Sequence, residues 1–296
     1  MPTLQVYSNS RIDIKNALKC TESGIPRIMG IVNVTPDSFH SASRKTTLES
    51  ALQASLNMIG NGATWIDIGG ESTRPGASEV STDEEMKRVI PVIKNLKEKF
   101  PNVLISIDTR KAEVARNAIK AGALMINDVS GFKDKEMMNV AVENQVAVCI
   151  MHMQGNPQNM QNQPNYIDCR SEIYGELKQK AISLVEMGLS PELIVLDPGI
   201  GFGKQQQHNI ELLQDISELK DLNNEKSPKC GWNTMWGVSR KSIIGQITEQ
   251  ENPEDRLAGT LATAAQAKLL GVDMLRVHDV VEHRDFLNVF SRLRED

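Results

Sequence analysis

The chain is poor in cysteine, and its few cysteines form no recognisable pattern. Its 296 residues include four, Cys20, Cys149, Cys169 and Cys230, with no C-x-x-C pair and no histidine spacing suited to zinc. A disulfide framework and a structural zinc are therefore not expected. Long apolar runs are missing too, since no stretch approaches ~18 apolar residues and the N-terminus lacks the apolar core of a signal peptide. We expect a cytoplasmic protein with no membrane partner.

Positive charge is not in excess. The formal net charge is -5, whereas a broad nucleic-acid surface needs clustered lysine and arginine. Nucleic acid is therefore not an expected partner, and local positive charge is available for a small anionic ligand. A chain of 296 residues suits one large domain, because α/β barrels of this size commonly remain undivided.

Short apolar segments alternate with segments of helical periodicity along most of the chain. The apolar segments end near residues 33, 67, 108, 127, 151, 197, 238 and 276, and the helical segments begin near 46, 83, 111, 134, 166, 210, 253 and 282. Eight strand–helix units predict an α/β fold, a single-domain (β/α)8 TIM barrel over residues 27–296, after an N-terminal lead segment, 1–26. An open doubly wound sheet is the alternative.

Polar residues stand at the ends of these predicted strands. In a TIM barrel the active site lies at the C-terminal ends of the strands. Polar groups buried there without partners would be costly, so they must either pair with one another or bind a ligand. The set comprises Asn33, Asp67, Asp108, Asn127, Asp197, Ser239, Lys241, Arg276 and His278.

The segment LIVLDPGIGFGK, residues 193–204, places a carboxylate beside a glycine-rich turn. It is not a Walker A loop, because Pro198 stands where the first glycine should be. It is not a dinucleotide-binding turn either, because Lys204 stands where that fingerprint needs its third glycine. Asp197 suits recognition of two parallel N–H donors, with a helix cap as the alternative. We expect the glycines to let backbone and ligand approach closely.

Taken together, these segments resemble the bacterial dihydropteroate synthases. The resemblance runs from Ile28 to about Asp285, through NVTPDSF, GGESTRPG, SIDT, INDVSG, MHMQGNP, DPGIGFGK, GVSRKS and RVHDV. It implies a TIM barrel that forms a homodimer. It also implies an Mg²⁺-dependent transferase of folate biosynthesis, which joins 6-hydroxymethyl-7,8-dihydropterin pyrophosphate to p-aminobenzoate and releases pyrophosphate.

The resemblance also implies three sub-sites. Asp197 would bind the pterin edge with Asn127, Asp108 and Lys241, while Met151 either covers the ring or is plain core. Arg276 and His278, which alternate along the last strand, would bind pyrophosphate, and Asn33 would be the Mg²⁺ ligand. The predicted p-aminobenzoate set is Thr73, Arg74, Pro75, Phe202 and Ser239.

The catalytic set implied in this way is Lys241, Asp197, Asp108, Arg276 and His278. Phe202 has glycines on both sides, so we expect it on a rim and not in a core. A Schiff base at Lys241 is a further alternative, but nothing in the sequence indicates a carbonyl substrate. The neighbouring Arg240 is expected to be a solvated charge.

The chain departs from the family pattern after NVTPDSF. Residues 40–44 read HSASR where Ser-Asp-Gly-Gly is usual, so Ser41 replaces an acidic residue and two glycines are missing. This favours an alternative, a non-catalytic pterin-binding paralogue, and a pterin-dependent methyltransferase with a corrinoid-protein partner is a third possibility. Residues 221–236 are expected to be a surface insertion without chemistry.

Overall fold

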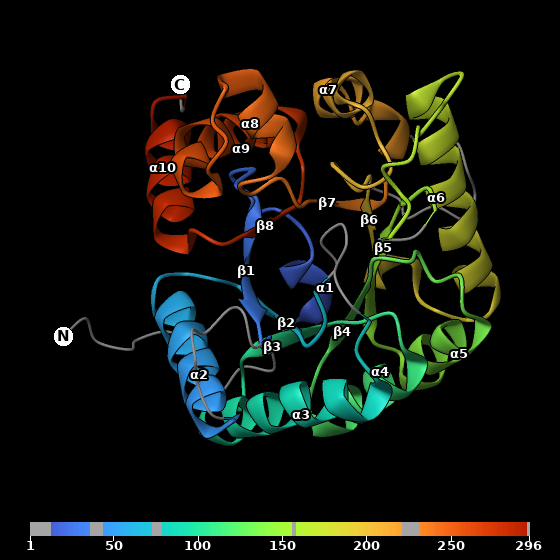
Figure 1. Cartoon of the computed structure of the whole chain (residues 1–296), viewed down its shortest axis with the longest axis vertical. Coiled ribbons are helices and arrows are strands. Elements are labelled where there is room, and N and C mark those ends of the chain that lie inside the picture. The colour runs from blue at the N-terminus through green and yellow to red at the C-terminus, as the bar shows by residue number, and fades with distance from the viewer. Residues whose placement is uncertain (1–12, 36–43, 73–78, 156–157, 221–230, 295–296) are drawn as a thin grey trace.

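The computed structural model describes residues 13–35, 44–72, 79–155, 158–220 and 231–294. Eight parallel strands form a closed barrel in chain order, and Figure 1 shows the helices around it. The strands are β1 (Arg27–Asn33), β2 (Trp65–Gly69), β3 (Leu104–Asp108), β4 (Met125–Asp128), β5 (Ala147–Met151), β6 (Ile194–Asp197), β7 (Asn233–Trp236) and β8 (Met274–Val277). The helices are α1 (Ile14–Ala17), α2 (Arg44–Gly60), α3 (Thr82–Lys99), α4 (Ala112–Ala121), α5 (Lys135–Asn144), α6 (Cys169–Glu186), α7 (Gln206–Gln214), α8 (Ser242–Thr248), α9 (Leu257–Leu270) and α10 (Val280–Arg292).

The strands form where short runs rich in isoleucine, valine and leucine are covered on both faces. All five residues of β3 are buried, for example, as expected for a parallel strand between a barrel interior and a layer of helices. β8 pairs with β1 and closes the ring, with Arg27 opposite Met274. The predicted TIM barrel is confirmed, and the open-sheet alternative is wrong.

The helices begin and end at residues that suit those positions. The Ser81 side chain accepts a hydrogen bond from the Glu84 amide at the start of α3, and Asp168 does the same for the Ser171 amide at the start of α6. Gly122 and Gly271 end α4 and α9 in the left-handed conformation, with φ of 115° and 72°. These local signals explain why the helical segments were predictable from the sequence.

Three helical details differ from the sequence prediction. The seven-residue helix α8 was not predicted, because it is too short to show apolar periodicity. α7 begins four residues earlier than expected and ends before a separate 3-10 turn, Ser217–Leu219. A 3-10 turn, Pro253–Arg256, precedes α9 where a continuous helix was expected.

The end of the barrel formed by the strand N-termini is closed by part of the lead segment. The Trp65 indole donates a hydrogen bond to the Ala17 carbonyl at 2.9 Å, and Trp65 and Leu18 are completely buried. Residues 13–26 therefore pack as part of the barrel and are not only a polar lead.

The expected surface insertion is only partly outside the core. Residues 221–230 lie outside the described ranges, but Gly231 and Trp232 are buried and lead directly into β7. The expectation of a surface segment is therefore wrong for its last residues. Among the helices that the structure describes, none is long and apolar enough to cross a membrane.

Candidate active site

The strand register brings Asn33 and Asp108 to the same level of the barrel. Asn33 lies opposite Gly69, and Gly69 lies opposite Asp108. A methyl group added at Gly69 would lie 3.4 Å from Asp108 Cβ and 3.7 Å from Asn33 Oδ1. The two predicted residues therefore flank a glycine whose missing side chain leaves space between them.

Arg276 joins three strands through two buried carboxylates. Its Nε donates to Asp67 Oδ2 and its Nη2 to Asp108 Oδ2, each at 2.6 Å. Asn127 Nδ2 donates to the same Asp67 oxygen at 3.0 Å. Arg276 Nη1 has no hydrogen-bond partner among the described residues, so one donor edge of the guanidinium remains available to a ligand.

Burial has a large effect on the pKa of one carboxylate of this cluster, Asp108. It raises the pKa of Asp108 to about 7, although the Arg276 guanidinium opposes that shift. Asp67 is completely buried, and its Oδ1 has no hydrogen-bond partner among the described residues. Asp67 was recognised in the sequence only as a strand end, yet it orients both Arg276 and Asn127. An unsatisfied buried oxygen is costly and is typical of a functional site.

Asp197 lies close to Arg276 across Gly237, which follows β7. A methyl group at Gly237 would lie 3.7 Å from Asp197 Oδ2 and 4.0 Å from Arg276 Cβ. Burial raises the pKa of Asp197, and the Lys241 ammonium opposes this. Asp197 Oδ1 accepts the Gly199 amide at 2.8 Å, and Oδ2 is the oxygen on the side of Gly237. A single small molecule can therefore span these two residues.

Lys241 lies over the turn that follows β6. Its Nζ donates to the Ile200 carbonyl and lies 4.3 Å from the centroid of the Phe202 ring, a cation–π distance. Burial lowers the pKa of Lys241 to about 8, while the Asp197 carboxylate acts in the opposite direction. The structure thus brings the predicted residues Lys241, Asp197 and Phe202 together.

Phe202 and Met151 belong to a small apolar cluster at the same end of the barrel. Met151, Val129, Met153 and Met160 are buried together, and the half-buried Phe202 packs against them. Phe202 was expected on a rim and not in a core. It is only partly buried, as expected, but it packs against an apolar cluster, which was not expected. Met151 lies opposite Asp197 in the β5–β6 register, so its side chain is a neighbour of the carboxylate as well as part of this cluster.

Ser239 and His278 contact each other on the last two loops of the barrel. Ser239 Oγ lies 3.0 Å from His278 Nδ1 and accepts the His278 amide at 3.2 Å. If the serine hydroxyl donates to Nδ1, the neutral imidazole carries its proton on Nε2. That tautomer presents an N–H donor to an anion.

Arg240 is not the solvated charge that was expected. Its guanidinium makes two hydrogen bonds to the Asp279 carboxylate and an ion pair with Glu254, and its side chain is 22% exposed. Arg240 also adopts a left-handed φ of 58°. The Arg240–Asp279 pair ties the segment of Ser239 to that of His278. Sequence alone did not predict this, because the partners are 39 residues apart.

The glycines after Asp197 allow two loops to touch. Methyl groups at Gly199 and Gly203 would lie 2.0 Å from the His152 carbonyl oxygen and 2.7 Å from the Gln154 carbonyl oxygen. Both glycines have positive φ, 67° and 60°. The close approach that we expected toward a ligand is, among the described residues, an approach to the segment that follows β5.

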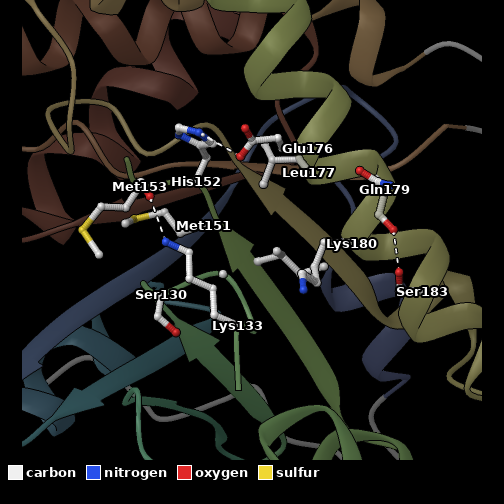
Figure 2. Close-up of a pocket in the computed structure, with 12 residues that line it drawn as sticks. Ser130, Lys133, Met151, His152, Met153, Glu176, Leu177, Gln179, Lys180 and Ser183 are labelled. Carbon is white, nitrogen blue, oxygen red and sulfur yellow. Dashed lines mark hydrogen bonds and ion pairs between the residues drawn. The ribbon is translucent and has the colours of Figure 1, made fainter. Parts of the chain in front are cut away.

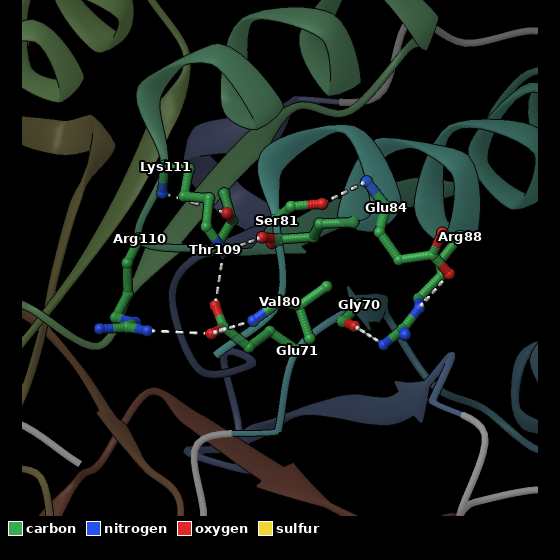
Figure 3. Close-up of polar contacts among 10 residues, drawn as sticks. Gly70, Glu71, Val80, Ser81, Glu84, Arg88, Thr109, Arg110 and Lys111 are labelled. Carbon is green, nitrogen blue, oxygen red and sulfur yellow. Dashed lines mark hydrogen bonds and ion pairs between the residues drawn. The ribbon is translucent and has the colours of Figure 1, made fainter. Parts of the chain in front are cut away.

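A second polar network fixes the chain where it leaves β2 (Figure 3). Glu71 Oε1 accepts from the Val80 amide at 3.2 Å and from Arg110 at 3.1 Å, and Glu71 Oε2 accepts from Lys111 at 2.7 Å. Lys111 also binds the completely buried Glu85 at 2.6 Å. Glu71 thus holds both described ends of the segment 72–79. Its role was not predicted from the GESTRPG motif.

A cavity of about 400 Å³ lies outside the barrel wall, between the end of β5, residues 130–133 and α6 (Figure 2). Its lining includes His152, whose Nε2 is 3.4 Å from Glu176 Oε2, and Lys133, which donates to the Met153 carbonyl at 3.3 Å. The cavity shares the segment 151–153 with the barrel mouth but does not contain the polar cluster around Arg276.

Several predicted residues lie outside the described ranges. Thr73, Arg74 and Pro75 fall in the segment 73–78, and His40 to Ser43 in the segment 36–43. Their predicted roles therefore remain predictions.

A magnesium site can be tested only through the donors that are present. The described residues contain no group of three or more histidine, cysteine, aspartate or glutamate side chains that could hold a metal ion. Asn33 Oδ1, however, makes no hydrogen bond to any described residue and lies near Asp108 on the other side of Gly69. One such oxygen fits Mg²⁺, which keeps several waters and completes its shell with substrate phosphates.

Comparison with known proteins agrees with this geometry. Residues 29–278 match the family described as pterin binding enzyme. The dihydropteroate synthase of Escherichia coli K12 is 42% identical over 264 residues, covering 89% of this chain and 90% of that protein. The dihydropteroate synthase of Synechocystis is 45% identical over 258 residues, covering 86% and 85%.

Solved structures agree as well. The Xanthomonas albilineans dihydropteroate synthase with 4-aminobenzoic acid superposes with a TM-score of 0.83 at 39% identity, covering 92% of this chain and 94% of that one. The same enzyme in complex with 7,8-dihydropteroate gives 0.81 at 36% identity, covering 93% and 96%. With the barrel, the polar mouth and these relatives in agreement, the chain belongs to the family of pterin-binding enzymes.

Proposed function

We propose that this chain is a dihydropteroate synthase, a transferase of folate biosynthesis. It joins 6-hydroxymethyl-7,8-dihydropterin pyrophosphate to p-aminobenzoate and produces 7,8-dihydropteroate and pyrophosphate. The observation that carries the proposal is the short separation of Asp197 from Arg276 across Gly237, because one substrate must be held by its ring at one end and its pyrophosphate at the other. Relatives at 42% and 45% identity carry this name.

The pterin is held by its polar edge. Asp197 Oδ2 accepts from the N–H donors of the ring, and a hydrogen bond to a charged group contributes about 1.5–3 kcal/mol. Asp108 and Asn127 extend the polar surface, and Lys241 donates to the acceptor side of the ring. Met151, opposite Asp197 in the strand register, covers a ring face.

The pyrophosphate is held by donors on β8 and the loop after it. His278 Nε2–H and the free Nη1 of Arg276 donate to its oxygens. Arg276 is already oriented by Asp67 and Asp108, so it needs no rearrangement to do so. Asn33 Oδ1 would contribute a protein oxygen to Mg²⁺, which neutralises charge on the leaving group when it is bound.

The p-aminobenzoate lies against Phe202 and Ser239, with Thr73, Arg74 and Pro75 completing its site. Its amine lone pair forms the new C–N bond to the methylene carbon, the C–O bonding pair leaves with pyrophosphate, and the amine loses a proton. C–O cleavage runs ahead of bond formation because the pterin ring accepts the positive charge. The buried carboxylates of Asp108 and Asp197 stabilise that charge.

Pyrophosphate release tests this function. With Mg²⁺ and the pterin pyrophosphate, we expect release that depends on p-aminobenzoate and is accompanied by dihydropteroate. Absence of release would favour the non-catalytic pterin-binding paralogue, for which the comparisons provide no support. Methyl transfer with a corrinoid protein would indicate the third possibility.

The proposal includes two properties beyond the chemistry. We propose that the protein is a homodimer, as the family resemblance implies, and that it is cytoplasmic, as the sequence composition predicts. Sedimentation of the purified protein tests the first property and cell fractionation the second.

A further inference from the structure

Lys204 is a buried lysine to which the proposed reaction assigns no role. It follows the glycine-rich turn and is 4% exposed. Its Nζ lies 2.8 Å from the Phe202 carbonyl, 3.0 Å from His152 Nδ1 and 3.3 Å from the His152 carbonyl. Burial lowers the pKa of Lys204 to about 7. In its charged form the ammonium has three N–H donors, and these three acceptors account for all of them. Lys204 has no donor left for a ligand.

The contacts of Lys204 join two loops that form the mouth of the barrel. One is the turn after β6, which contains Phe202. The other is the segment after β5, which begins at His152. The backbones of the two already meet at Gly199 and Gly203, and the Tyr166 hydroxyl donates to the Gly203 carbonyl at 2.7 Å. Among the described residues, Lys204 provides the only ammonium in this contact between the turn after β6 and the segment after β5.

The His152 ring is itself held in place. Its Nδ1 faces Lys204, and its Nε2 lies 3.4 Å from Glu176 on α6 (Figure 2). Burial lowers the pKa of His152 to about 3, so the ring is neutral and can accept from Lys204. The connection therefore runs from α6 through His152 to Lys204 and the Phe202 carbonyl.

The turn that Lys204 holds carries groups of the proposed p-aminobenzoate site. The Phe202 ring lies 4.3 Å from Lys241 Nζ, and Lys241 donates to the Ile200 carbonyl of the same turn. A movement of the Phe202 carbonyl would move the ring and displace it from Lys241. Such a movement would affect the Asp197 carboxylate less, because that carboxylate is fixed by β6 and by its hydrogen bond from the Gly199 amide.

We propose that Lys204 is a positioning residue for the second substrate, which sets the place of the Phe202 ring by holding its carbonyl against His152. The inference rests on the proposed function, because p-aminobenzoate is the ligand assigned to that ring. Lys204 acts through Phe202 and is not a catalytic residue.

The test replaces Lys204 by methionine, which keeps the length of the side chain and removes its donors. We expect the KM for p-aminobenzoate to rise about tenfold, as for the loss of one charged hydrogen bond. The dissociation constant of the pterin pyrophosphate should stay within about twofold of its original value. An unchanged KM for p-aminobenzoate, or an equal loss of affinity for both substrates, would overturn the proposal.

Lys133→Met is the matched control. Lys133 also donates to loop carbonyls after β5, at Met153 and Gly155, with distances of 3.3 and 3.5 Å, but it does not contact the turn after β6. Both KM values should be unchanged in this variant. A rise equal to that of Lys204→Met would show that any lysine of this region has the same effect, and would overturn a specific role for Lys204.

A double-mutant cycle tests whether Lys204 acts through Phe202. In a Phe202→Ala background the Lys204→Met change should produce no further rise in the KM for p-aminobenzoate, because the ring that Lys204 positions is gone. Additive effects would contradict the proposed route. A role limited to fold stability predicts additivity.

Two further measurements keep the test decisive. If Lys204→Met does not fold, His152→Phe removes the ring acceptor and leaves the Lys204 bond to Phe202. We then expect a smaller rise in the same KM, and an unchanged value overturns the proposal. If the unmodified protein releases no pyrophosphate, the proposed function fails by itself. The positioning role is then judged by p-aminobenzoate binding to the protein and its variants, and equal binding overturns it.

Discussion

At the scale of single residues, the mouth of the barrel concentrates buried charges. Asp67, Asp108 and Asp197 are buried at this end of the barrel, and Arg276 reaches two of them. Charges in such surroundings are costly unless they are paired. Their pairing is incomplete, because Asp67 Oδ1 has no described partner. A ligand is the simplest reason to keep them.

Asp197→Asn tests the carboxylate that is proposed to bind the pterin ring. The amide keeps an oxygen for the Gly199 N–H but loses the charge, so the dissociation constant of the pterin substrate should rise at least about tenfold, or ~1.4 kcal/mol. Turnover of bound substrate should fall less. Titration calorimetry and steady-state kinetics measure the two effects.

Lys241→Ala should lower kcat/KM by at least about tenfold as well, and unchanged kinetics in either variant, Asp197→Asn or Lys241→Ala, would refute the role assigned to that residue.

Asp108 provides a prediction about pH. Burial raises its pKa to about 7 from an ordinary value of 3.8. Between these pH values the folded state holds a proton that the unfolded state has released, so this residue's contribution to stability is lost as pH rises through about 7. Asparagine has no carboxyl proton, so this pH dependence of stability should be absent from the Asp108→Asn variant.

Urea unfolding of both proteins between pH 4 and 8 measures this effect. The free energy of unfolding of the unmodified protein, relative to Asp108→Asn, should fall as pH rises toward 7 and then level off. A constant difference would contradict the raised pKa. The same variant should lose activity, because the Asp108 carboxyl group belongs to the proposed pterin site.

At the scale of elements, the strands and longer helices were predictable because each carries its own signal. A short apolar run marks each strand, and cap residues such as Ser81 and Gly271 mark helix ends. Contacts between loops carry no such signal. Lysine is rarely buried, and nothing in the sequence around Lys204 or Arg240 indicates their distant partners.

The β6–α7 turn provides a prediction at this scale. Gly199→Ala would place a methyl group 2.0 Å from the His152 carbonyl oxygen at a φ of 67°, so the loops must separate. We expect a loss of at least about 2 kcal/mol in the free energy of unfolding and a fall in kcat/KM. Urea unfolding and kinetics provide the measurements.

Gly175→Ala is the control for that variant. Gly175 lies inside α6 with no atom within 4 Å of an added methyl group. Alanine there should stabilise the protein by about 0.5–1 kcal/mol and leave activity unchanged. Equal effects of the two substitutions would show that the contact between the loops is unimportant.

At the scale of the whole molecule, the two ends of the barrel differ in structure: one carries the polar cluster and the other is closed by packing. The C-terminal ends of the strands carry the polar cluster, while α1 covers the opposite end through Ala17 and Trp65. The sequence predicted the polar end, because its polar residues stand at or just after the ends of the predicted apolar strands. It did not predict the closed end, because a four-residue helix has no periodicity and its partner lies 48 residues away.

This separation predicts that stability and substrate binding can be changed independently. Leu18 is completely buried beneath the barrel, so Leu18→Ala should lower the free energy of unfolding by about 2–5 kcal/mol. Leu293→Ala removes the same atoms from a side chain that is 80% exposed and should change stability by less than about 0.5 kcal/mol. At a temperature where both variants are folded, the KM for each substrate should equal that of the unmodified protein, since neither residue lies near the mouth. A rise in either KM in Leu18→Ala, measured with the folded fraction known, would mean that the closed end controls the geometry of the open one.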